Sequence, residues 1–247
     1  ESASNFIGGQ AKVKKNGKVI YIDEKGQAKL PATYEGVGYY KEGLAWARKG
    51  DKWGFIDTAG KVVIPFTYKK VGDFHQGRAW VWKGDKWGHI DRTGKVTTPI
   101  IYDKATRFSS QYTGDSLFAS VTLNGKYGKV GINGNLVIPC EYIGIDHFSE
   151  GMAKVRKQGD GARPFGFVNY SGELVIPCIY EKAERFKKGK SVTTVFKDGR
   201  WGLVNKEGKM LLPCKYYSIS EKDADTYLVW DGTERFVVDE KGNRVEE

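Results

Sequence analysis

The sequence predicts an all-β fold of seven tandem repeats of 34–40 residues. We expect these repeats to form a propeller-like ring, with an open β-superhelix or solenoid as the alternative. Three observations predict this fold class. An Asp-x-x-Gly landmark recurs along nearly the whole chain, a two-residue turn signal recurs in phase with it, and no segment shows sustained helical periodicity.

The composition fits a folded β-domain of this size. Of the 247 residues, 40% are hydrophobic and 13% are aromatic, which is enough for a core without disulfides. The 32 glycines are spaced rather than clustered, which indicates many tight turns. We expect residues 1–5 to form an N-terminal tail and residues 6–245 to form a single domain of seven units.

The first strand of a unit carries the pattern Gly-x-Ala-x-Val or a relative of it. In the second unit, GLAWAR (43–48) alternates small apolar residues with larger ones, as a half-buried strand does. A two-residue hairpin turn follows, because dipeptides that favour positive φ recur at this point. These dipeptides are Asn16-Gly17, Gly50-Asp51, Gly84-Asp85, Asn124-Gly125, Asp198-Gly199 and Asp231-Gly232.

The second strand carries an aromatic-glycine pair in the internal units. The pairs are Trp53-Gly54, Trp87-Gly88, Tyr127-Gly128, Phe165-Gly166 and Trp201-Gly202. The two terminal units have Val19-Ile20 and Arg235-Phe236 instead. We interpret the ring as a core filler, and the glycine as the residue that lets a neighbouring sheet approach closely. The recurrence of the pair favours this architectural role over a ring of indoles that stacks ligands.

The Asp-x-x-Gly turn follows the second strand. Its first residue is Asp23, Asp57, Asp91, Gly131, Asn169, Asn205 or Asp239. An Asp or Asn side chain at this position is expected to cap backbone N–H groups, while the glycine takes the left-handed conformation. One carboxylate per unit lies too far from the next to share an ion, so we predict no metal site at these turns.

The third strand, such as KVVIP (61–65), is expected to end at its proline, because proline cannot donate to a central ladder. The tyrosine three residues later is predicted to pack back on the sheet with its hydroxyl group satisfied near the surface. Examples are Pro65 with Tyr68 and Pro99 with Tyr102. A short fourth strand is expected around KKVGDF (69–74).

The recurring string WGFIDxxGKxVIPxxYxxVxxFxxGxAxV resembles the WG-repeat family, also called KWG repeats, which is found mainly in bacteria. The resemblance covers about residues 6 to 245 and implies a repetitive β-protein that is often attached to other domains. It implies no catalytic residues. The residues expected to build the repeat include Trp53, Gly54, Asp57, Pro65, Tyr68, Trp87, Gly88, Asp91, Pro99, Tyr102, Trp201 and Gly202.

The cysteines and histidines predict no reactive site. Cys140, Cys178 and Cys214 all follow the proline of the repeat, where other units have an apolar residue, so we expect small buried residues with free thiols. The histidines, at 75, 89 and 147, match no metal-binding or triad spacing. No phosphate or dinucleotide fingerprint is present. We therefore expect no cofactor, no metal and no enzyme activity.

Departures from the repeat are the candidate binding residues. Trp46 and Trp80 share one repeat position, and Trp82 lies two residues further along the same strand face. Trp and Arg are typical anchors of protein interfaces, although lateral packing between two units explains this aromatic cluster as well. The candidate residues are Trp46, Arg48, Arg78, Trp80, Trp82, Tyr112, Asp115 and Arg163. The last three lie in insertions, at 109–116 and 158–164, and a further insertion spans 220–226; these segments are either binding loops or loops without function.

The sequence favours a non-catalytic interaction or scaffold domain that binds another protein and is monomeric by itself. The alternative is a glycan-binding, lectin-like module of a bacterial surface or secreted protein, but the tryptophan set is confined to two units. The net charge of +10 is diffuse, and no nucleic-acid-binding module accompanies it, so we expect no specific nucleic-acid binding.

The expected location is a bacterial cell envelope or the extracellular space rather than the cytoplasm. No stretch approaches the ~18 apolar residues of a membrane span, so no membrane insertion is expected. No signal peptide is visible and the sequence begins at Glu1, so it neither shows nor excludes export. The sequence predicts neither the identity of the partner nor the domains that flank this one.

Overall fold

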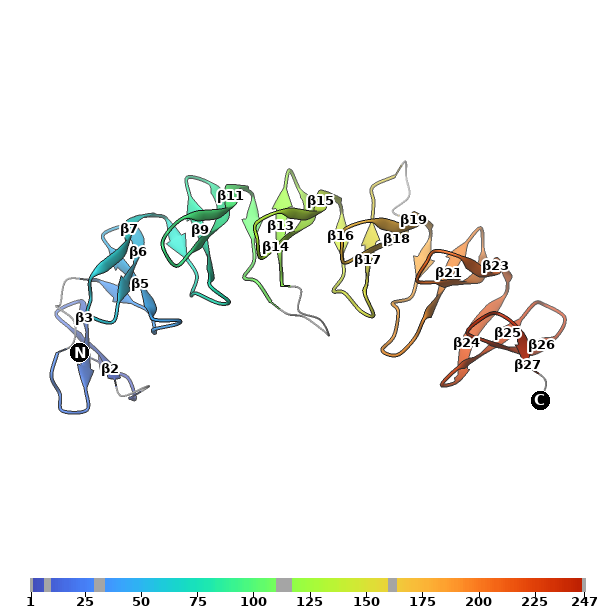
Figure 1. The fold of residues 1–247 in the computed structure, drawn as a ribbon, viewed down its shortest axis with the longest axis horizontal. Coiled ribbons are helices and arrows are strands. Elements are labelled where there is room, and N and C mark those ends of the chain that lie inside the picture. The colour runs from blue at the N-terminus through green and yellow to red at the C-terminus, as the bar shows by residue number, and fades with distance from the viewer. Residues whose placement is uncertain (1, 7–9, 29–33, 110–116, 160–163, 246–247) are drawn as a thin grey trace. The chain divides into compact units, whose positions relative to one another are not determined.

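The computed structural model describes residues 2–6, 10–28, 34–109, 117–159 and 164–245. Within these residues the regular elements are all β-strands, so no helix there could cross a membrane. The described strands form seven antiparallel sheets that follow one another in chain order, and we number them sheet 1 to sheet 7 (Figure 1). The predicted all-β tandem-repeat fold is therefore confirmed.

Sheet 1 has three described strands and sheets 2 to 4 have four each. Sheet 1 contains β1 (Ser2–Ala3), β2 (Gln10–Lys15) and β3 (Lys18–Asp23). Sheet 2 contains β4 (Gly36–Val37), β5 (Leu44–Lys49), β6 (Lys52–Asp57) and β7 (Val62–Tyr68). Sheet 3 contains β8 (Lys70–Val71), β9 (Arg78–Lys83), β10 (Lys86–Asp91) and β11 (Val96–Tyr102). Sheet 4 contains β12 (Lys104–Ala105), β13 (Phe118–Leu123), β14 (Lys126–Gly131) and β15 (Leu136–Tyr142).

Sheets 5 to 7 also have four described strands each. Sheet 5 contains β16 (Gly144–Ile145), β17 (Met152–Arg156), β18 (Phe165–Asn169) and β19 (Leu174–Tyr180). Sheet 6 contains β20 (Lys182–Ala183), β21 (Val192–Lys197), β22 (Arg200–Asn205) and β23 (Met210–Tyr216). Sheet 7 contains β24 (Ser218–Asp223), β25 (Thr226–Trp230), β26 (Arg235–Asp239) and β27 (Arg244–Val245).

The chain divides into two compact units, and the single domain expected for residues 6–245 stays a prediction. Unit 1 runs from the N-terminus to Ser109 and adds Phe118–Asn124 and Val130–Asn135, while unit 2 is built mainly of Gly125–Lys129 and Leu136–Glu247. Within the expected N-terminal tail, residues 1–5, β1 pairs with β2. Closure of the seven sheets into a ring stays a prediction.

Two of the predicted turns recur as expected. Asn16 and Gly17 both have positive φ, at 50° and 76°, as a two-residue hairpin requires. In the Asp-x-x-Gly turn, Asp57 Oδ1 accepts hydrogen bonds of 2.9 Å from the N–H groups of Ala59 and Lys61. Gly60 follows with φ of 79°, so the predicted capping and left-handed roles are both confirmed.

Sheet 7 departs from the predicted turn and loop. Trp230 pairs with Arg235, so four residues, 231–234, connect the strands where a two-residue turn at Asp231-Gly232 was predicted. Asp231 Oδ1 accepts hydrogen bonds from the N–H groups of Thr233 and Glu234, which stabilises the longer loop. The insertion at 220–226 is not a plain loop either, because it lengthens the hairpin of β24 and β25.

The third strand does not end at its proline. β7 continues through Pro65 to Tyr68, and it tolerates the proline because it lies at the edge of its sheet. Trp53 pairs with Tyr68 and Phe55 pairs with Ile64, so the three residues 65–67 bulge opposite Gly54. The same register shift occurs in sheets 3, 5 and 6.

The glycine of the aromatic-glycine pair makes room for this bulge. A Cβ atom on Gly54 would lie 2.5 Å from the carbonyl oxygen of Ile64, and one on Gly166 would lie 2.5 Å from that of Ile176. The close neighbour is therefore a strand of the same sheet, not a neighbouring sheet as predicted. The glycine of the Asp-x-x-Gly turn is the one that lets a neighbouring sheet approach. A Cβ on Gly172 would lie 1.9 Å from the carbonyl oxygen of Val137 in the preceding sheet.

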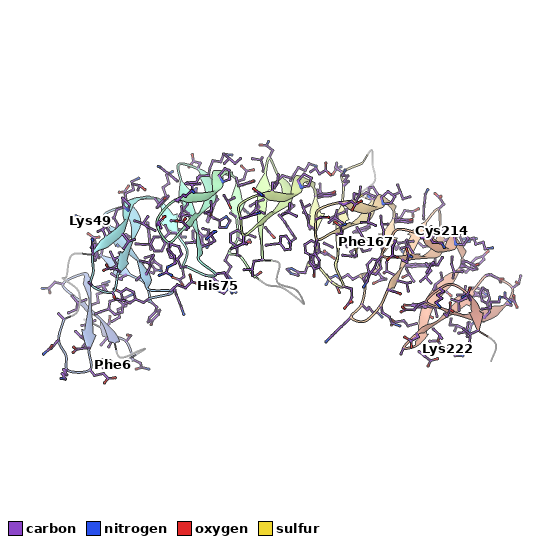
Figure 2. All side chains as sticks on the ribbon, viewed as in Figure 1. Phe6, Lys49, His75, Phe167, Cys214 and Lys222 are labelled. Atoms are coloured by element: carbon purple, nitrogen blue, oxygen red, sulfur yellow. The ribbon has the colours of Figure 1, made fainter. Side chains whose placement is uncertain are left out.

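Consecutive sheets within a unit share a hydrophobic core. Phe55 of sheet 2 contacts Phe74 of sheet 3 with ring centroids 4.7 Å apart, and Phe167 contacts Phe186 in the same way at 5.2 Å. Phe167 lies among the side chains of its unit, whereas Lys49 points outward (Figure 2). The tyrosine after the proline joins sheets as well, because the Tyr34 hydroxyl group donates to the carbonyl oxygen of Gly60 at 3.2 Å.

The substitution Gly166→Ala tests the close approach inside a sheet. The new Cβ would overlap backbone atoms of β19, so we expect the free energy of unfolding to fall by about 1–3 kcal/mol in urea denaturation. Gly144→Ala in the same sheet is the matched control, because a Cβ there meets no atom within 4 Å. We expect the control to stay within about 0.5 kcal/mol of the parent. Equal effects of the two substitutions would contradict the assigned role of Gly166.

Candidate functional site

The strongest candidate site is a cavity in unit 1 between sheets 2 and 3. Trp46 on β5 and Trp80 on β9 both line this cavity, which has a volume of about 490 Å³. Such a volume lies in the usual range of ligand pockets. The other lining residues are Lys41, Val71, Gly72, Asp73, Phe74, His75 and Arg107.

Each of the two indoles packs on a glycine that directly follows a short strand, Gly38 after β4 and Gly72 after β8. A Cβ atom on Gly38 would lie 2.3 Å from Trp46 Nε1, and one on Gly72 would lie 2.2 Å from Trp80 Nε1. Any larger residue would displace the indole. In sheets 1, 4, 5 and 6 the two equivalent positions hold other residues. A backbone hydrogen bond joins the two positions in each sheet, and it identifies the pairs as Ser4 with Lys12, Thr106 with Ser120, Asp146 with Lys154 and Glu184 with Thr194.

A second aromatic ring holds each indole in place. Trp46 contacts Trp53 of the aromatic-glycine pair with ring centroids 4.8 Å apart, and Trp80 contacts Trp87 at 4.9 Å. Both indoles are half-buried. Each therefore presents part of its ring to the cavity from a fixed position, which is the arrangement expected of a binding anchor.

The other predicted site residues that the structure describes, Trp82, Arg48 and Arg78, do not line this cavity. Trp82 stacks on Trp87 at 5.9 Å, with Lys69 Nζ 5.2 Å from its ring centroid. Arg48 is exposed, and Arg78 donates from Nη1 to the carbonyl oxygen of Gly77. Tyr112, Asp115 and Arg163 lie outside the described residues.

The sequence reasoning missed the polar residues of the cavity. Lys41, Asp73, His75 and Arg107 come from connections that follow the short strands of three consecutive sheets. One signal could have identified part of the site, since Gly38 and Gly72 each stand eight residues before a tryptophan. The charged residues gave no such signal, because nothing in their spacing marks them as neighbours.

Comparison with known protein families identifies the repeat. The model of the WG containing repeat matches residues 21–53, 53–87, 87–127, 127–159, 165–201 and 201–221. The chain belongs to the WG-repeat family. This membership confirms the predicted resemblance and extends over most of the chain. No curated protein matches the sequence of this WG-repeat chain.

Solved structures resemble the chain only distantly. A eukaryotic initiation factor has 8% identity and a TM-score of 0.37, over 97% of this chain and 85% of that one. PorZ, a surface component of the type-IX secretion system of Porphyromonas gingivalis, has 11% identity and a TM-score of 0.34, over 98% and 37%. AztD from Citrobacter koseri has 13% identity and a TM-score of 0.31, over 99% and 84%.

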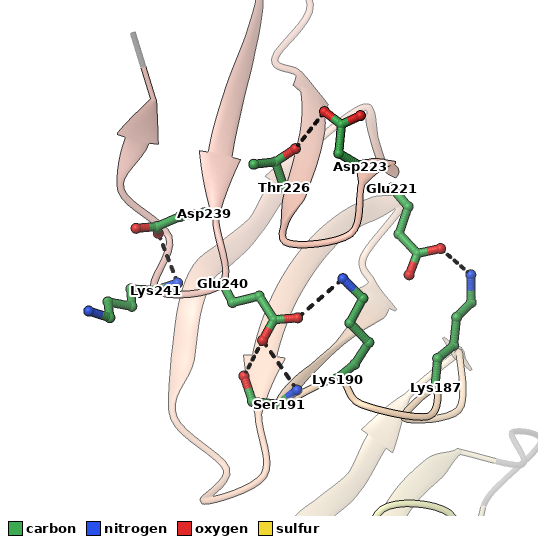
Figure 3. A network of polar contacts seen from close by, with 9 residues as sticks. All are labelled: Lys187, Lys190, Ser191, Glu221, Asp223, Thr226, Asp239, Glu240 and Lys241. Atoms are coloured by element: carbon green, nitrogen blue, oxygen red, sulfur yellow. Dashed lines mark hydrogen bonds and ion pairs between the residues drawn. The ribbon is translucent and has the colours of Figure 1, made fainter.

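Unit 2 has a smaller cavity at an equivalent junction of the WG repeats, between sheets 6 and 7. It measures about 250 Å³, and Thr194 stands where sheet 2 has Trp46. Lys187 forms an ion pair with Glu221 across this junction (Figure 3). Glu240 accepts a hydrogen bond of 2.6 Å from Ser191 Oγ and lies 3.3 Å from Lys190 Nζ. Lys187 and Lys190 at this junction thus each lie beside a carboxylate of the chain.

Among the described residues, no group of three or more His, Cys, Asp or Glu side chains is arranged to hold a metal ion. The three cysteines carry free thiols and are half-buried rather than fully buried. Burial raises the pKa of the Cys178 and Cys214 thiols, which makes them poor nucleophiles. Cys178 Sγ would lie 2.8 Å from a Cβ on Gly166, so it packs against the aromatic-glycine pair.

His89 is a core residue of the third WG repeat rather than a site residue. It is fully buried at the position that Phe55 and Phe167 hold in other sheets. Its Nε2 forms a hydrogen bond of 2.7 Å with the carbonyl oxygen of Thr106. Its ring contacts that of Phe108, with the ring centroids 4.6 Å apart. Burial lowers the pKa of His89 to about 4, with a smaller opposing effect of the Thr106 bond.

We expect His89 to make the stability of the protein pH-dependent between about pH 6.5 and 4. The folded state keeps the imidazole neutral in this range, whereas the unfolded chain takes up a proton below its ordinary pKa of 6.5. The free energy of unfolding should therefore be highest above pH 6.5. It should fall by about 1.4 kcal/mol per pH unit, or about 3 kcal/mol in total, as the pH falls to 4.

Urea denaturation of the parent and of His89→Phe across this pH range checks the expectation. Phenylalanine is the matched replacement because Phe55 and Phe167 occupy the equivalent position. The difference in slope between the two proteins isolates the contribution of His89, because both proteins contain the same carboxylates. Parallel curves for the two proteins would show that His89 does not titrate as proposed.

Proposed function

We propose that this WG-repeat chain is a non-catalytic interaction domain that binds a segment of another protein in the Trp46–Trp80 cavity. One observation carries the proposal. Two indoles from consecutive sheets face one open cavity, and each rests on a glycine at a position where other sheets have larger residues. Positions that recur in every sheet are explained by folding, but this combination is confined to two sheets.

The contacts of the two indoles favour binding over lateral packing between repeats. Each indole contacts an aromatic ring of its own sheet. Among the described rings, no contact joins Trp46 directly to Trp80. Both indoles line the same cavity, which has room for a ligand side chain. A large apolar side chain placed there would bury indole surface that now faces water, which is how aromatic anchors contribute to binding.

The polar groups of the cavity favour binding over catalysis. An enzyme needs a nucleophile or a base that another group orients through a hydrogen bond. Lys41, Asp73 and His75 line the cavity, yet among the described residues no hydrogen bond or ion pair joins these three side chains. A protein-binding role needs no such constellation.

A glycan ligand is less favoured than a protein segment. Sugar rings stack on an open aromatic face, and Trp46 has Trp53 on one side while Lys12 Nζ lies 5.9 Å from its ring centroid. The partly covered ring suits a side chain that enters the cavity better than a flat sugar ring. The same aromatic set would also be expected in more of the repeats of a lectin-like array.

The double substitution Trp46→Lys/Trp80→Ser tests the proposed function. Lys154 and Ser120 occupy the equivalent position in other sheets, so the repeat accommodates both replacements. Affinity capture from a lysate of the source cells, followed by quantitative mass spectrometry, should show partner proteins reduced about ten-fold with the variant. The affinity of each purified partner should then fall by a similar factor in calorimetry.

The matched control is Trp230→Arg, because Trp230 is an exposed tryptophan of unit 2 and Arg48 occupies the equivalent position in sheet 2. Far-UV circular dichroism of each variant establishes that the β-fold persists. Undiminished capture of every partner by the double variant would overturn the proposal, as would an equal loss with Trp230→Arg.

A further inference from the structure

We infer that the segment bound between Trp46 and Trp80 is acidic, with an aspartate or glutamate next to a large apolar side chain. This inference rests on the proposed function and adds the chemistry of the ligand. It follows from the charged residues that line the cavity, and from the ion pair that the residues at the same repeat positions form at the equivalent junction of unit 2.

Positive groups outnumber negative ones around the cavity. Lys41 and Arg107 carry fixed positive charges and are exposed, and Asp73 is the one acidic residue that lines the cavity. In the part of the chain that the structure describes, the side chains of Lys41, Asp73 and Arg107 make no ion pair or hydrogen bond. Two cations are thus available to a carboxylate of the ligand.

The junction of sheets 6 and 7 has charged residues at the same repeat positions. Lys187 follows Phe186 as Lys41 follows Tyr40, and Glu221 follows Ser220 as Asp73 follows Gly72. There the lysine and the carboxylate pair with each other (Figure 3). The same repeat position therefore holds a satisfied lysine beside Thr194 and an unpaired lysine beside Trp46.

Further positive charge lies beside the indole of Trp46. Lys12 Nζ lies 5.9 Å from the centroid of this ring, and burial together with the charge of Lys14 lowers the pKa of Lys12. A carboxylate near Lys12 would favour its charged form and so oppose the burial and the charge of Lys14. The net charge of +10 acts in the same direction, because a positive field speeds the approach of an acidic partner.

The apolar part of the cavity requires an apolar group in the ligand as well. Val71 and Phe74 line it and are buried, and the two indoles form its walls. A free anion or a purely acidic chain would leave this surface uncovered. An acidic residue beside a Phe, Leu or Trp fills the apolar part and places its carboxylate near Lys41 and Arg107.

Selection from a random twelve-residue peptide display library on the whole chain tests this ligand class. Clones that bind the parent are screened against Trp46→Lys/Trp80→Ser, so only peptides that need both indoles are retained. We expect these peptides to be enriched in Asp and Glu adjacent to a large apolar residue. An anionic oligosaccharide, oligogalacturonate, is titrated in parallel against the parent and the same variant.

Charge variants then separate the two proposals. For a retained peptide, Lys41→Gln/Arg107→Gln should weaken binding about ten-fold and flatten its salt dependence. The control Lys187→Gln/Arg185→Gln removes the same charge at equivalent positions of unit 2, and should change affinity less than about two-fold.

Each outcome decides one proposal. Peptides that need the indoles but show no acidic enrichment, or an equal effect of the two charge pairs, would overturn the acidic ligand and leave the interaction domain in place. Binding of oligogalacturonate that needs the indoles, without any such peptide, would replace the protein segment by a glycan. Absence of any ligand that needs the indoles would overturn the proposed function itself.

Discussion

The close approach of an edge strand to a glycine is the constraint on which sheets 2 to 6 depend. In sheet 2, residues 65–67 bulge opposite Gly54, and the carbonyl oxygen of Ile64 occupies the space that a Cβ would take. The bulge lets the edge strand carry Pro65, and a proline on an edge discourages pairing with other chains. It also returns Tyr68 to a position opposite Trp53. The Trp-Gly and Pro-x-x-Tyr landmarks therefore describe one interaction seen from its two strands.

The last sheet has a different residue at the glycine position. Phe236 stands there on β26 and pairs with Val229. The Arg244 guanidinium lies 3.9 Å from the centroid of the Phe236 ring. The close approach described for Gly54 therefore belongs to the sheets that carry the aromatic-glycine pair.

The sequence predicted those features that depend on local spacing and could not predict those that depend on register. The turn at Asp57 and the hairpin at Asn16-Gly17 depend on residues a few positions apart, so the residue types alone predict them. The bulge at Pro65 could not be predicted, because the repeat gives the order of the residues but not which residue of the edge strand lies opposite Gly54. The cavity was harder still. Lys41 and Arg107 line one cavity only because consecutive sheets follow one another in space, and no period in the sequence marks these two residues as neighbours.

The WG repeat separates the residues that build the sheet from those that are free to vary. The pair of positions held by Gly72 and Trp80 is held by Asp146 and Lys154 in sheet 5, where the two charged groups lie 3.8 Å apart. Both pairs satisfy the same backbone hydrogen bond between strands, so the sheet forms with either. The glycine offers the sheet no side-chain contact of its own, and its small size serves the indole alone. Because the sheet forms with either pair, the tryptophan that packs on a glycine in two adjacent sheets supports the proposed binding site.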